Sequence, residues 1–319
     1  MTISTLSSCF VTGAVGCVGQ TLLERLESTG IGVVGLDLVP PPRRLRAATW
    51  VRGNILDVNG YKEALQGIDT VVHLAAKAHS TPRTVEEVEH FWRVNLEGTR
   101  ILIRAAEKHG VRRFIHVSTV AVLSPSIGGP AYAYADSKRA AEEEVLGFGG
   151  RIEVVVVRPT TVYGPNDRGN VYKLIRWVDR GLPAIVGSGD NRKSLVYARN
   201  LADALLFLSE HGKNGQTYTV TDGCDLSMRE IVQAISRFLG RGNRLSSIPV
   251  GVVKVVAEVN EKMAGWFGLP RFFGQEMIEK LTGETVFDPS ALFSLGFVPR
   301  YGFEKGMEET VQWYRHSAR

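Results

Sequence analysis

The feature that most restricts the fold of this 319-residue sequence is a glycine-rich segment between an apolar run and an amphipathic one. The segment reads TGAVGCVG over residues 12–19. It follows the strand-like run Cys9–Thr12 and precedes Thr21–Ser28, whose leucines fall on one helical face. A strand, a glycine turn and a helix in this order are typical of a dinucleotide-binding βαβ unit.

Each glycine of the segment has a separate role in such a unit. Gly13 permits the tight turn, Gly16 lets the backbone approach a pyrophosphate, and Gly19 lets the helix pack closely on the strand. The helix N-terminus then offers free N–H groups and a partial positive charge to the phosphates. The predicted cofactor contacts in this loop are Gly13, Val15, Gly16, Cys17, Val18 and Gly19.

An acidic residue closes the next predicted strand, Gly32–Leu38. Asp37 can accept hydrogen bonds from both hydroxyls of a ribose and would repel a 2′-phosphate, which favours NAD over NADP. Arg43 and Arg44 could bind such a phosphate, but they follow the stiff run Pro40–Pro42 and are interpreted as facing solvent.

Short β-branched runs alternate with helical patterns through the first half of the chain. Their continuous apolar character suits parallel strands that are buried on both faces. The expected strands are Cys9–Thr12, Gly32–Leu38, Thr70–Leu74, Arg113–Ser118 and Ile152–Val157, and the expected helices are Thr21–Ser28, Val85–His109 and Tyr132–Leu146. We therefore predict an α/β protein with a Rossmann-type, doubly wound parallel sheet.

The alternation loosens beyond about Pro165, where a helix at Val171–Arg180, a strand at Ser194–Ala198 and a helix at Leu201–His211 are expected. The predicted NAD-binding domain covers residues 1–166, and residues 193–222 are expected to pack back on it. Residues 167–319 would form a smaller, mixed α/β substrate domain.

The charge pattern argues against a nucleic-acid or membrane-surface partner. Lys and Arg number 38 against 33 Asp and Glu, and the densest basic spots, Arg43–Arg46 and Arg112–Arg113, form no long run. The most apolar stretch, Ile248–Val259, is too short to span a bilayer, and the N-terminus lacks the pattern of a signal peptide. We expect a cytoplasmic protein.

The sequence offers no metal site. Cys9, Cys17 and Cys224 form no CxxC pair and have no histidine at ligand spacing, so they are read as incidental thiols. The histidines His73, His79 and His116 are interpreted as packing or loop residues, again without metal-ligand spacing.

A tyrosine and a lysine four residues apart mark the candidate catalytic set. Tyr134 and Lys138 begin a predicted helix, and their spacing places both side chains on one face. A phenol is a weak base at neutral pH, but a neighbouring ammonium group and an oxidised nicotinamide both favour its phenolate. Thr119, just past a predicted strand, can hydrogen-bond the same substrate oxygen.

These pieces resemble the extended short-chain dehydrogenase/reductases, the superfamily of NAD-dependent nucleotide-sugar epimerases and dehydratases. Besides TGAVGCVG and Asp37, the matching motifs are HLAA at 73–76, VNLEGT at 94–99, VST at 117–119, YADSK at 134–138, RPTTVYGP at 158–165, DPSALFSLGFVPR at 288–300 and WYR at 313–315. The resemblance covers nearly the whole chain.

The resemblance implies roles for individual residues. Thr119 would fill the catalytic Ser/Thr position, Tyr134 that of the base, and Lys138 that of the ligand of the nicotinamide ribose. Further expected cofactor contacts are Asn54 and Ile55 beside the adenine, Leu74, Ala75 and Ala76 along the cofactor bed, and Asn95 as support from the long helix. Expected substrate contacts, besides Thr119 and Tyr134, are Asn170 and the diphosphate-binding Arg192 and Lys193. A homodimer is expected as well.

The resemblance leaves several functions open. The first is a 4-epimerase of a UDP-hexose or UDP-N-acetylhexosamine with tightly held NAD, and the second is a reductase of a UDP-4-keto-6-deoxy sugar. The third is a 3β-hydroxysteroid-dehydrogenase-like oxidoreductase, with an apolar pocket formed in part by Val252, Val253, Val255 and Val256. A catalytically silent NAD-sensing protein is disfavoured by the intact Thr119, Tyr134 and Lys138.

Overall fold

The computed structural model describes residues 6–42, 45, 49–78, 80, 82, 84–126, 128–148, 152–242, 247–252 and 282–317. The chain divides into two compact units by its internal contacts. Unit 1 comprises Met1–Thr160, Val196–Thr221 and Asp288–Arg300, and unit 2 comprises Thr161–Leu195, Asp222–Phe287 and Tyr301–Arg319. Arg43, Arg44, Arg46, His79 and the segment 253–281 lie outside the described residues. The division into a nucleotide half at 1–166 and a substrate half at 167–319 stays a prediction.

A seven-stranded sheet in the order β3-β2-β1-β4-β5-β6-β10 forms the centre of unit 1, and all its neighbouring strands are parallel. The strands are β1 (Ser8–Thr12), β2 (Gly32–Asp37), β3 (Thr49–Arg52), β4 (Thr70–His73), β5 (Arg113–Val117), β6 (Glu153–Pro159) and β10 (Gln216–Val220). The predicted Rossmann-type sheet is thereby confirmed. The strand order reverses between β1 and β4, and ligands of such sheets bind at the carboxyl ends of the strands at this point.

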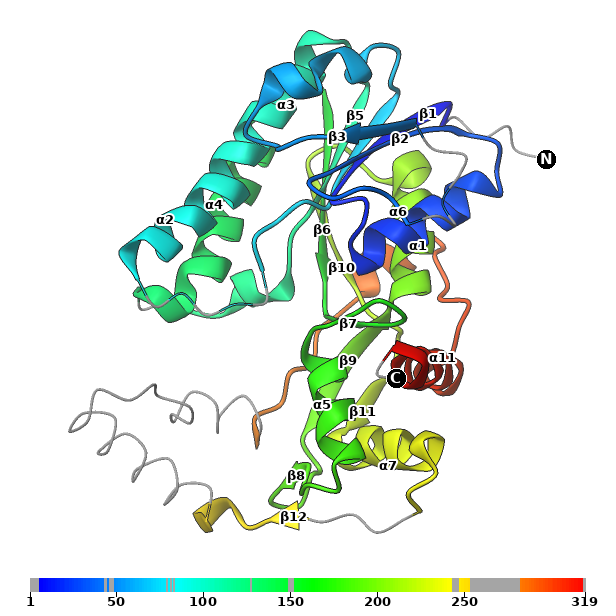
Figure 1. Cartoon of the computed structure of the whole chain (residues 1–319). Coiled ribbons are helices and arrows are strands. Elements are labelled where there is room, and N and C mark those ends of the chain that lie inside the picture. Colours follow the sequence, from blue (N-terminus) through cyan, green and yellow to red (C-terminus); the bar gives the residue numbers. More distant parts are fainter. Residues whose placement is uncertain are drawn as a thin grey trace. The chain divides into compact units, whose positions relative to one another are not determined.

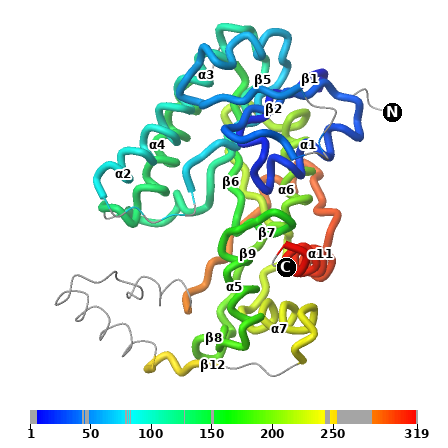
Figure 2. Tube along the Cα trace, in the orientation of Figure 1, coloured from blue at the N-terminus to red at the C-terminus, as the bar shows by residue number. Residues whose placement is uncertain are grey.

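Helices cover both faces of this sheet. Figure 1 shows α2 (Val85–Trp92), α3 (Gly98–Lys108) and α4 (Ala133–Gly147) on one face, and α1 (Cys17–Glu27) and α6 (Ala198–His211) on the other. Although α1 and α6 are far apart in the sequence, they pack side by side, as the tube in Figure 2 also shows. The short helix α10 (Ser290–Phe293) packs near β10.

The predicted long helix over Val85–His109 is confirmed as a continuous helical run to Lys108, but the type of helix changes along it. Residues Arg93–Glu97 form a π-helical segment between α2 and α3. Such a segment widens one turn by a residue and is often found at functional sites. Here it contains Asn95, a buried polar residue whose side chain is bound by segments outside the helix.

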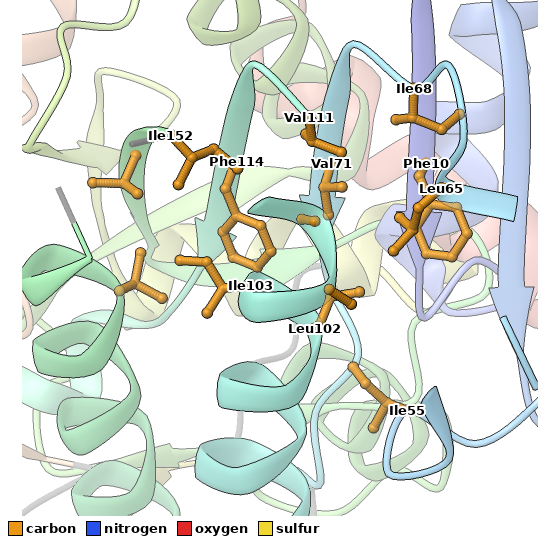
Figure 3. Packing of buried hydrophobic residues seen from close by; sticks show 14 of the residues in the cluster. Phe10, Ile55, Leu65, Ile68, Val71, Leu102, Ile103, Val111, Phe114 and Ile152 are labelled. Atoms are coloured by element: carbon orange, nitrogen blue, oxygen red, sulfur yellow. The ribbon is translucent and has the colours of Figure 1, made fainter. Parts of the chain in front are cut away.

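The core of unit 1 lies between the sheet and α3. Phe10, Val71 and Phe114 come from three adjacent strands and pack with Leu102 and Ile103 of α3 (Figure 3). All five side chains are fully buried, so this cluster fixes the helix to the strands whose carboxyl ends carry the candidate site.

The described part of unit 2 combines small sheets with helices. Its strands are β7 (Thr161–Tyr163), β8 (Ile185–Val186), β9 (Arg192–Tyr197), β11 (Asp225–Ser227) and β12 (Ser247–Ile248), and its helices are α5 (Asn170–Asp179), α7 (Met228–Leu239) and α11 (Phe303–Ser317). Strands β11, β9 and β7 form one sheet, in which β11 and β9 are antiparallel. Helix α7 packs on both α5 and α11. Within the described ranges, none of the helices combines the length and the apolarity needed to cross a membrane.

Candidate active site

The glycine loop after β1 is packed too tightly for side chains at two positions. Gly13 has a φ of +66°, and a Cβ atom there would lie 2.8 Å from the backbone nitrogen of Ala75. A Cβ atom on Gly19 would lie 2.8 Å from the backbone of Ala14 and closer still to the carbonyl oxygen of Gly13. These contacts hold the loop against both the end of β4 and the first turn of α1.

The first turn of α1 is suited to an anion. The helix begins at Cys17, four residues before the predicted start, so its N-terminus lies directly at the loop. Gly16 occupies the N-cap position and has no side chain to cap the helix, and the first turn carries no acidic residue. The exposed N–H dipoles therefore fit a pyrophosphate.

Asp37, at the end of β2, is bound to the glycine loop. Its Oδ2 accepts a hydrogen bond from the Val15 N–H at 2.9 Å, and its Oδ1 accepts one from the Val39 N–H at 3.3 Å. Because carboxylate oxygens can each accept more than one hydrogen bond, this arrangement leaves acceptor capacity for ribose hydroxyls. The loop geometry and this carboxylate together fit NAD.

A chain of buried hydrogen bonds connects β1, β4 and α3. The Ala75 N–H donates to Thr12 Oγ1 at 3.1 Å, and Thr12 Oγ1 lies 2.8 Å from Nδ1 of His73. On the other side, Nε2 of His73 lies 2.8 Å from Thr99 Oγ1, which itself donates to the Asn95 carbonyl at 2.6 Å. The hydroxyl proton of Thr99 is thus used, so the proton of His73 lies on Nε2 and its Nδ1 accepts from Thr12.

Asn95 joins the cofactor bed to the catalytic helix. Its Oδ1 accepts from the Lys77 N–H at 2.7 Å, and its Nδ2 donates to the Lys77 carbonyl at 3.1 Å. Nδ2 also donates to Ser137 Oγ on α4 at 2.9 Å, and Ser137 in turn donates to the Tyr134 carbonyl. The predicted contacts Leu74, Ala75 and Ala76 directly precede Lys77, so the π-helical segment connects them to the YADSK motif.

Thr119 and Tyr134 are brought together, as the sequence predicts. The Thr119 hydroxyl lies near enough to the phenol of Tyr134 to favour its charged form. Thr119 Oγ1 accepts from the Ala121 N–H at 3.2 Å, which leaves its own proton to donate to the phenol oxygen. Burial raises the pKa of Tyr134, and the Thr119 hydroxyl acts in the opposite direction by favouring the phenolate. The Tyr134 ring packs edge-on against Phe91, with ring centroids 6.4 Å apart.

Lys138 is almost completely buried on the inner face of α4, with 2% of its surface exposed. Its Nζ donates to the Val117 carbonyl at 2.7 Å and lies 3.3 Å from Nε2 of His116. Burial lowers the pKa of Lys138 to about 7, and the negative charge of Glu142 partly opposes this shift. Arg158 holds that carboxylate through three hydrogen bonds. The charge of Lys138 therefore responds to small changes around neutral pH.

The two residues expected beside the adenine differ in exposure. Asn54 is exposed, and its Oδ1 accepts a hydrogen bond from the Leu56 N–H at 3.0 Å. The side chain of Ile55 belongs to the core cluster and packs where a Cβ atom on Gly98 would lie. Its backbone carbonyl accepts from the Tyr61 hydroxyl at 3.1 Å, and its contact with the adenine stays a prediction.

The predicted substrate contacts other than Thr119 and Tyr134 lie in unit 2. Asn170 is the first residue of α5. Arg192 and Lys193 begin β9; Arg192 donates to the Asp225 carbonyl at 3.0 Å, and Lys193 donates to the Gly283 carbonyl at 2.7 Å. Burial lowers the pKa of Lys193. Among the described residues, no three His, Cys, Asp or Glu side chains gather as a metal-binding group.

The contact of His116 with Lys138 is a feature near the candidate site that the sequence analysis does not predict. The side chain of His116 is fully buried on β5 and lies against Lys138, whereas the sequence analysis reads it as a packing or loop residue. A signal was available, because His116 lies three residues before Thr119 in a strand that otherwise consists of apolar residues and Arg113.

The chain is similar to several known proteins over most of its length. The family model described as the NAD dependent epimerase/dehydratase family matches residues 9–221. The chain is 29% identical to the UDP-glucose 4-epimerase of Vibrio cholerae, over 96% of this chain and 94% of that protein. It is 28% identical to the N-acetyl-alpha-D-glucosaminyl-diphospho-ditrans,octacis-undecaprenol 4-epimerase of Escherichia coli O157:H7, over 94% of this chain and 93% of that protein. The structure of MoeE5 in complex with UDP-glucose and NAD superimposes with a TM-score of 0.75 and 25% identity, covering 98% of this chain and all of that one.

Proposed function

Since the chain belongs to the NAD-dependent epimerase/dehydratase family of the extended short-chain dehydrogenase/reductases, we propose that it is a nucleotide-sugar 4-epimerase. Its substrate would be a UDP-hexose or a UDP-N-acetylhexosamine. The observation that carries the proposal is the Thr119 hydroxyl beside the phenol of Tyr134, with Lys138 one turn away on the same helix. Two of the relatives are 4-epimerases, which supports this reaction.

In the proposed mechanism Tyr134 acts as the base and Thr119 positions the oxygen that reacts. The phenolate of Tyr134 removes the proton of the sugar 4-hydroxyl, while the Thr119 hydroxyl binds the same oxygen. Lys138 contributes a positive charge that favours the phenolate, and its ammonium group would hold the nicotinamide ribose. NAD, when bound, supplies a hydride acceptor and donor for the sugar C4.

The same residues serve the return step. Tyr134 gives its proton back to the C4 oxygen when the opposite face of the sugar is reduced, so the chain ends each turnover in its starting protonation state. Epimerisation requires that the sugar turn while its nucleotide stays bound. We propose that Asn170, Arg192 and Lys193 hold the nucleotide part, because guanidinium and ammonium groups bind diphosphate oxygens.

The test uses purified protein without added cofactor. It is incubated separately with UDP-glucose, UDP-N-acetylglucosamine and a panel of apolar alcohols including sterols, and the products are separated by chromatography. We expect the 4-epimer of a UDP-sugar to form with no net NADH. In parallel incubations, oxidation of an apolar alcohol only, with stoichiometric NADH formed from added NAD, would contradict the proposal. Reduction of an added UDP-4-keto-6-deoxy sugar by added NADH, without epimer formation from either UDP-sugar, would contradict it as well.

Cofactor preference provides a separate prediction. We expect Asp37→Ser to weaken NAD binding by about tenfold, because it removes a charged acceptor for the ribose hydroxyls and the acceptor of the Val15 N–H. The same change removes the carboxylate that repels a 2′-phosphate, so the ratio of NADP to NAD affinity should rise. Both affinities can be measured by calorimetry. Glu63→Ser removes an exposed carboxylate of the same unit and should leave both unchanged.

A further inference from the structure

Three side chains that carry nitrogen are buried together at the candidate active site. Lys138, His116 and His73 come from α4, β5 and β4, and their exposed fractions are 2%, 0% and 0%. The two imidazole ring centroids lie 5.3 Å apart. Buried polar groups are costly unless they are hydrogen-bonded, so the distribution of protons within this cluster is restricted.

His73 has no hydrogen-bonding capacity left for its neighbours. Its Nδ1 accepts from Thr12 and its Nε2 donates to Thr99, as derived above. Burial and the nearby charge of Lys138 hold the pKa of His73 well below its usual range, so the ring stays neutral. His73 therefore acts as a structural link between strands, and His116 has to find its partner elsewhere.

The polar partner of His116 is Lys138. Nε2 of His116 lies 3.3 Å from the lysine Nζ, and its Nδ1 is buried with no hydrogen-bond partner in the described part of the chain. An ammonium group only donates hydrogen bonds, so Nε2 must be the acceptor when Lys138 is charged. Burial, the Lys138 charge and His73 hold the pKa of His116 well below its usual range, which keeps this lone pair available.

We propose that His116 is a positioning residue for Lys138: it accepts one N–H of the ammonium group and thereby supports the charge that Tyr134 needs as a phenolate. The Val117 carbonyl accepts a second N–H, which leaves one N–H of Lys138 for the cofactor ribose. This role deepens the proposed function and rests on it, because Lys138 matters only if Tyr134 is the base.

The other groups around Lys138 cannot replace this acceptor. Glu142 lies one turn further along α4, attracts the ammonium charge and is itself bound by Arg158 of β6. His73 is neutral and fully engaged, and Tyr134 lies one turn earlier on the same helix. Without the imidazole, the buried ammonium would lose one of its hydrogen bonds while its burial stayed the same. The charged form of Lys138 would then be less stable.

The experiment measures the titration of Lys138 directly in the cofactor-free and substrate-free protein. Lysine labelled with ¹³C at the ε-carbon is incorporated, and the Lys138 resonance is assigned by its loss in Lys138→Ala. We expect His116→Phe to lower the titration midpoint of Lys138 by about one pH unit or more, the shift that follows from losing a hydrogen bond to a charged group. His116→Gln retains an acceptor and should stay close to the wild-type midpoint.

Two controls separate positioning from packing. His73→Asn replaces the imidazole next to His116 but removes no hydrogen-bond partner of Lys138. It should therefore lower the Tm, while the titration midpoint of Lys138 should move by less than about 0.3 pH units. His116→Met provides a second apolar replacement in case His116→Phe gives no cooperative melting transition. An unchanged midpoint in the folded apolar variants, or equal shifts in His116→Gln and His116→Phe, would overturn the proposal.

The pH dependence of activity is the second measurement. If Lys138 loses its charge more easily, the phenolate of Tyr134 forms at higher pH, so the acid limb of kcat should move to higher pH in His116→Phe but not in His116→Gln. The NMR titration of Lys138 needs neither substrate nor turnover. Its result therefore stands or falls separately from the assignment of the protein as an epimerase.

Discussion

Replacing Tyr134 with phenylalanine is expected to lower kcat by about 10²–10⁴-fold, the usual contribution of a positioned acid–base group. The substitution removes only the hydroxyl beside Thr119 and keeps the ring that packs edge-on against Phe91. The fold and the NAD site should therefore persist. Turnover of the UDP-sugar identified in the product assay is measured alongside NAD affinity, which should change by less than about twofold.

Tyr314→Phe is the matched control for this prediction. It removes a phenol of the same kind, whose hydroxyl donates to Asp179 in unit 2 at 2.8 Å. The loss of this hydrogen bond should lower the stability by about 0.5–1.5 kcal/mol and leave kcat nearly unchanged. If Tyr134→Phe retained full activity, the assignment of the base would be wrong. If it lost NAD binding as well, the loss of activity would not report on proton transfer.

The substitution Gly19→Ala, which adds a single methyl group, is expected to weaken NAD binding by about 100-fold and to lower the Tm by about 5–10 °C. The added Cβ atom would meet the backbone of Gly13 and Ala14, and backbone atoms cannot rotate away as a side chain can. Either α1 moves away from the loop or the loop loses its turn. In both cases the N–H groups at the start of α1 no longer converge on one pyrophosphate.

Gly147→Ala tests whether this effect depends on packing. Gly147 is also a helical glycine, but a Cβ atom there would meet nothing within 4 Å. Because alanine favours helices over glycine by about 0.5–1 kcal/mol, this variant should be as stable as the wild type or slightly more so. Calorimetry and thermal melting of both variants give the comparison. Similar losses of NAD affinity in both would contradict the packing argument.

The central strands could be predicted from the sequence, whereas the two edge strands could not. Runs such as Val154–Val157 are continuously apolar because they are buried on both faces, and this signal is local. The edge strand β3 is half-exposed and short, and β10 alternates polar with apolar residues. Their placement depends on pairing with β2 and β6, which local periodicity does not reveal.

The candidate site also has one part that the sequence predicts and one part that it does not. The glycine spacing and the spacing of Tyr134 and Lys138 are local patterns, and both place their residues where they are expected. The π-helical segment is not visible in the sequence, because it depends on the partners that Asn95 finds on Lys77 and Ser137. The same holds for His116, whose burial against Lys138 follows from the packing of α4 on the sheet rather than from its neighbours in sequence.

Unit 1 is built from three separate stretches of sequence, so its parts become available for folding one after another during synthesis. Strand β10, from Val196–Thr221, pairs with β6 only after the ribosome has produced the segment Thr161–Leu195 of unit 2. Until then the backbone groups of β6 form an open edge, which can pair with other nascent chains. We therefore expect fragments that end before Gln216 to aggregate during synthesis, even though they contain the glycine loop, Tyr134 and Lys138.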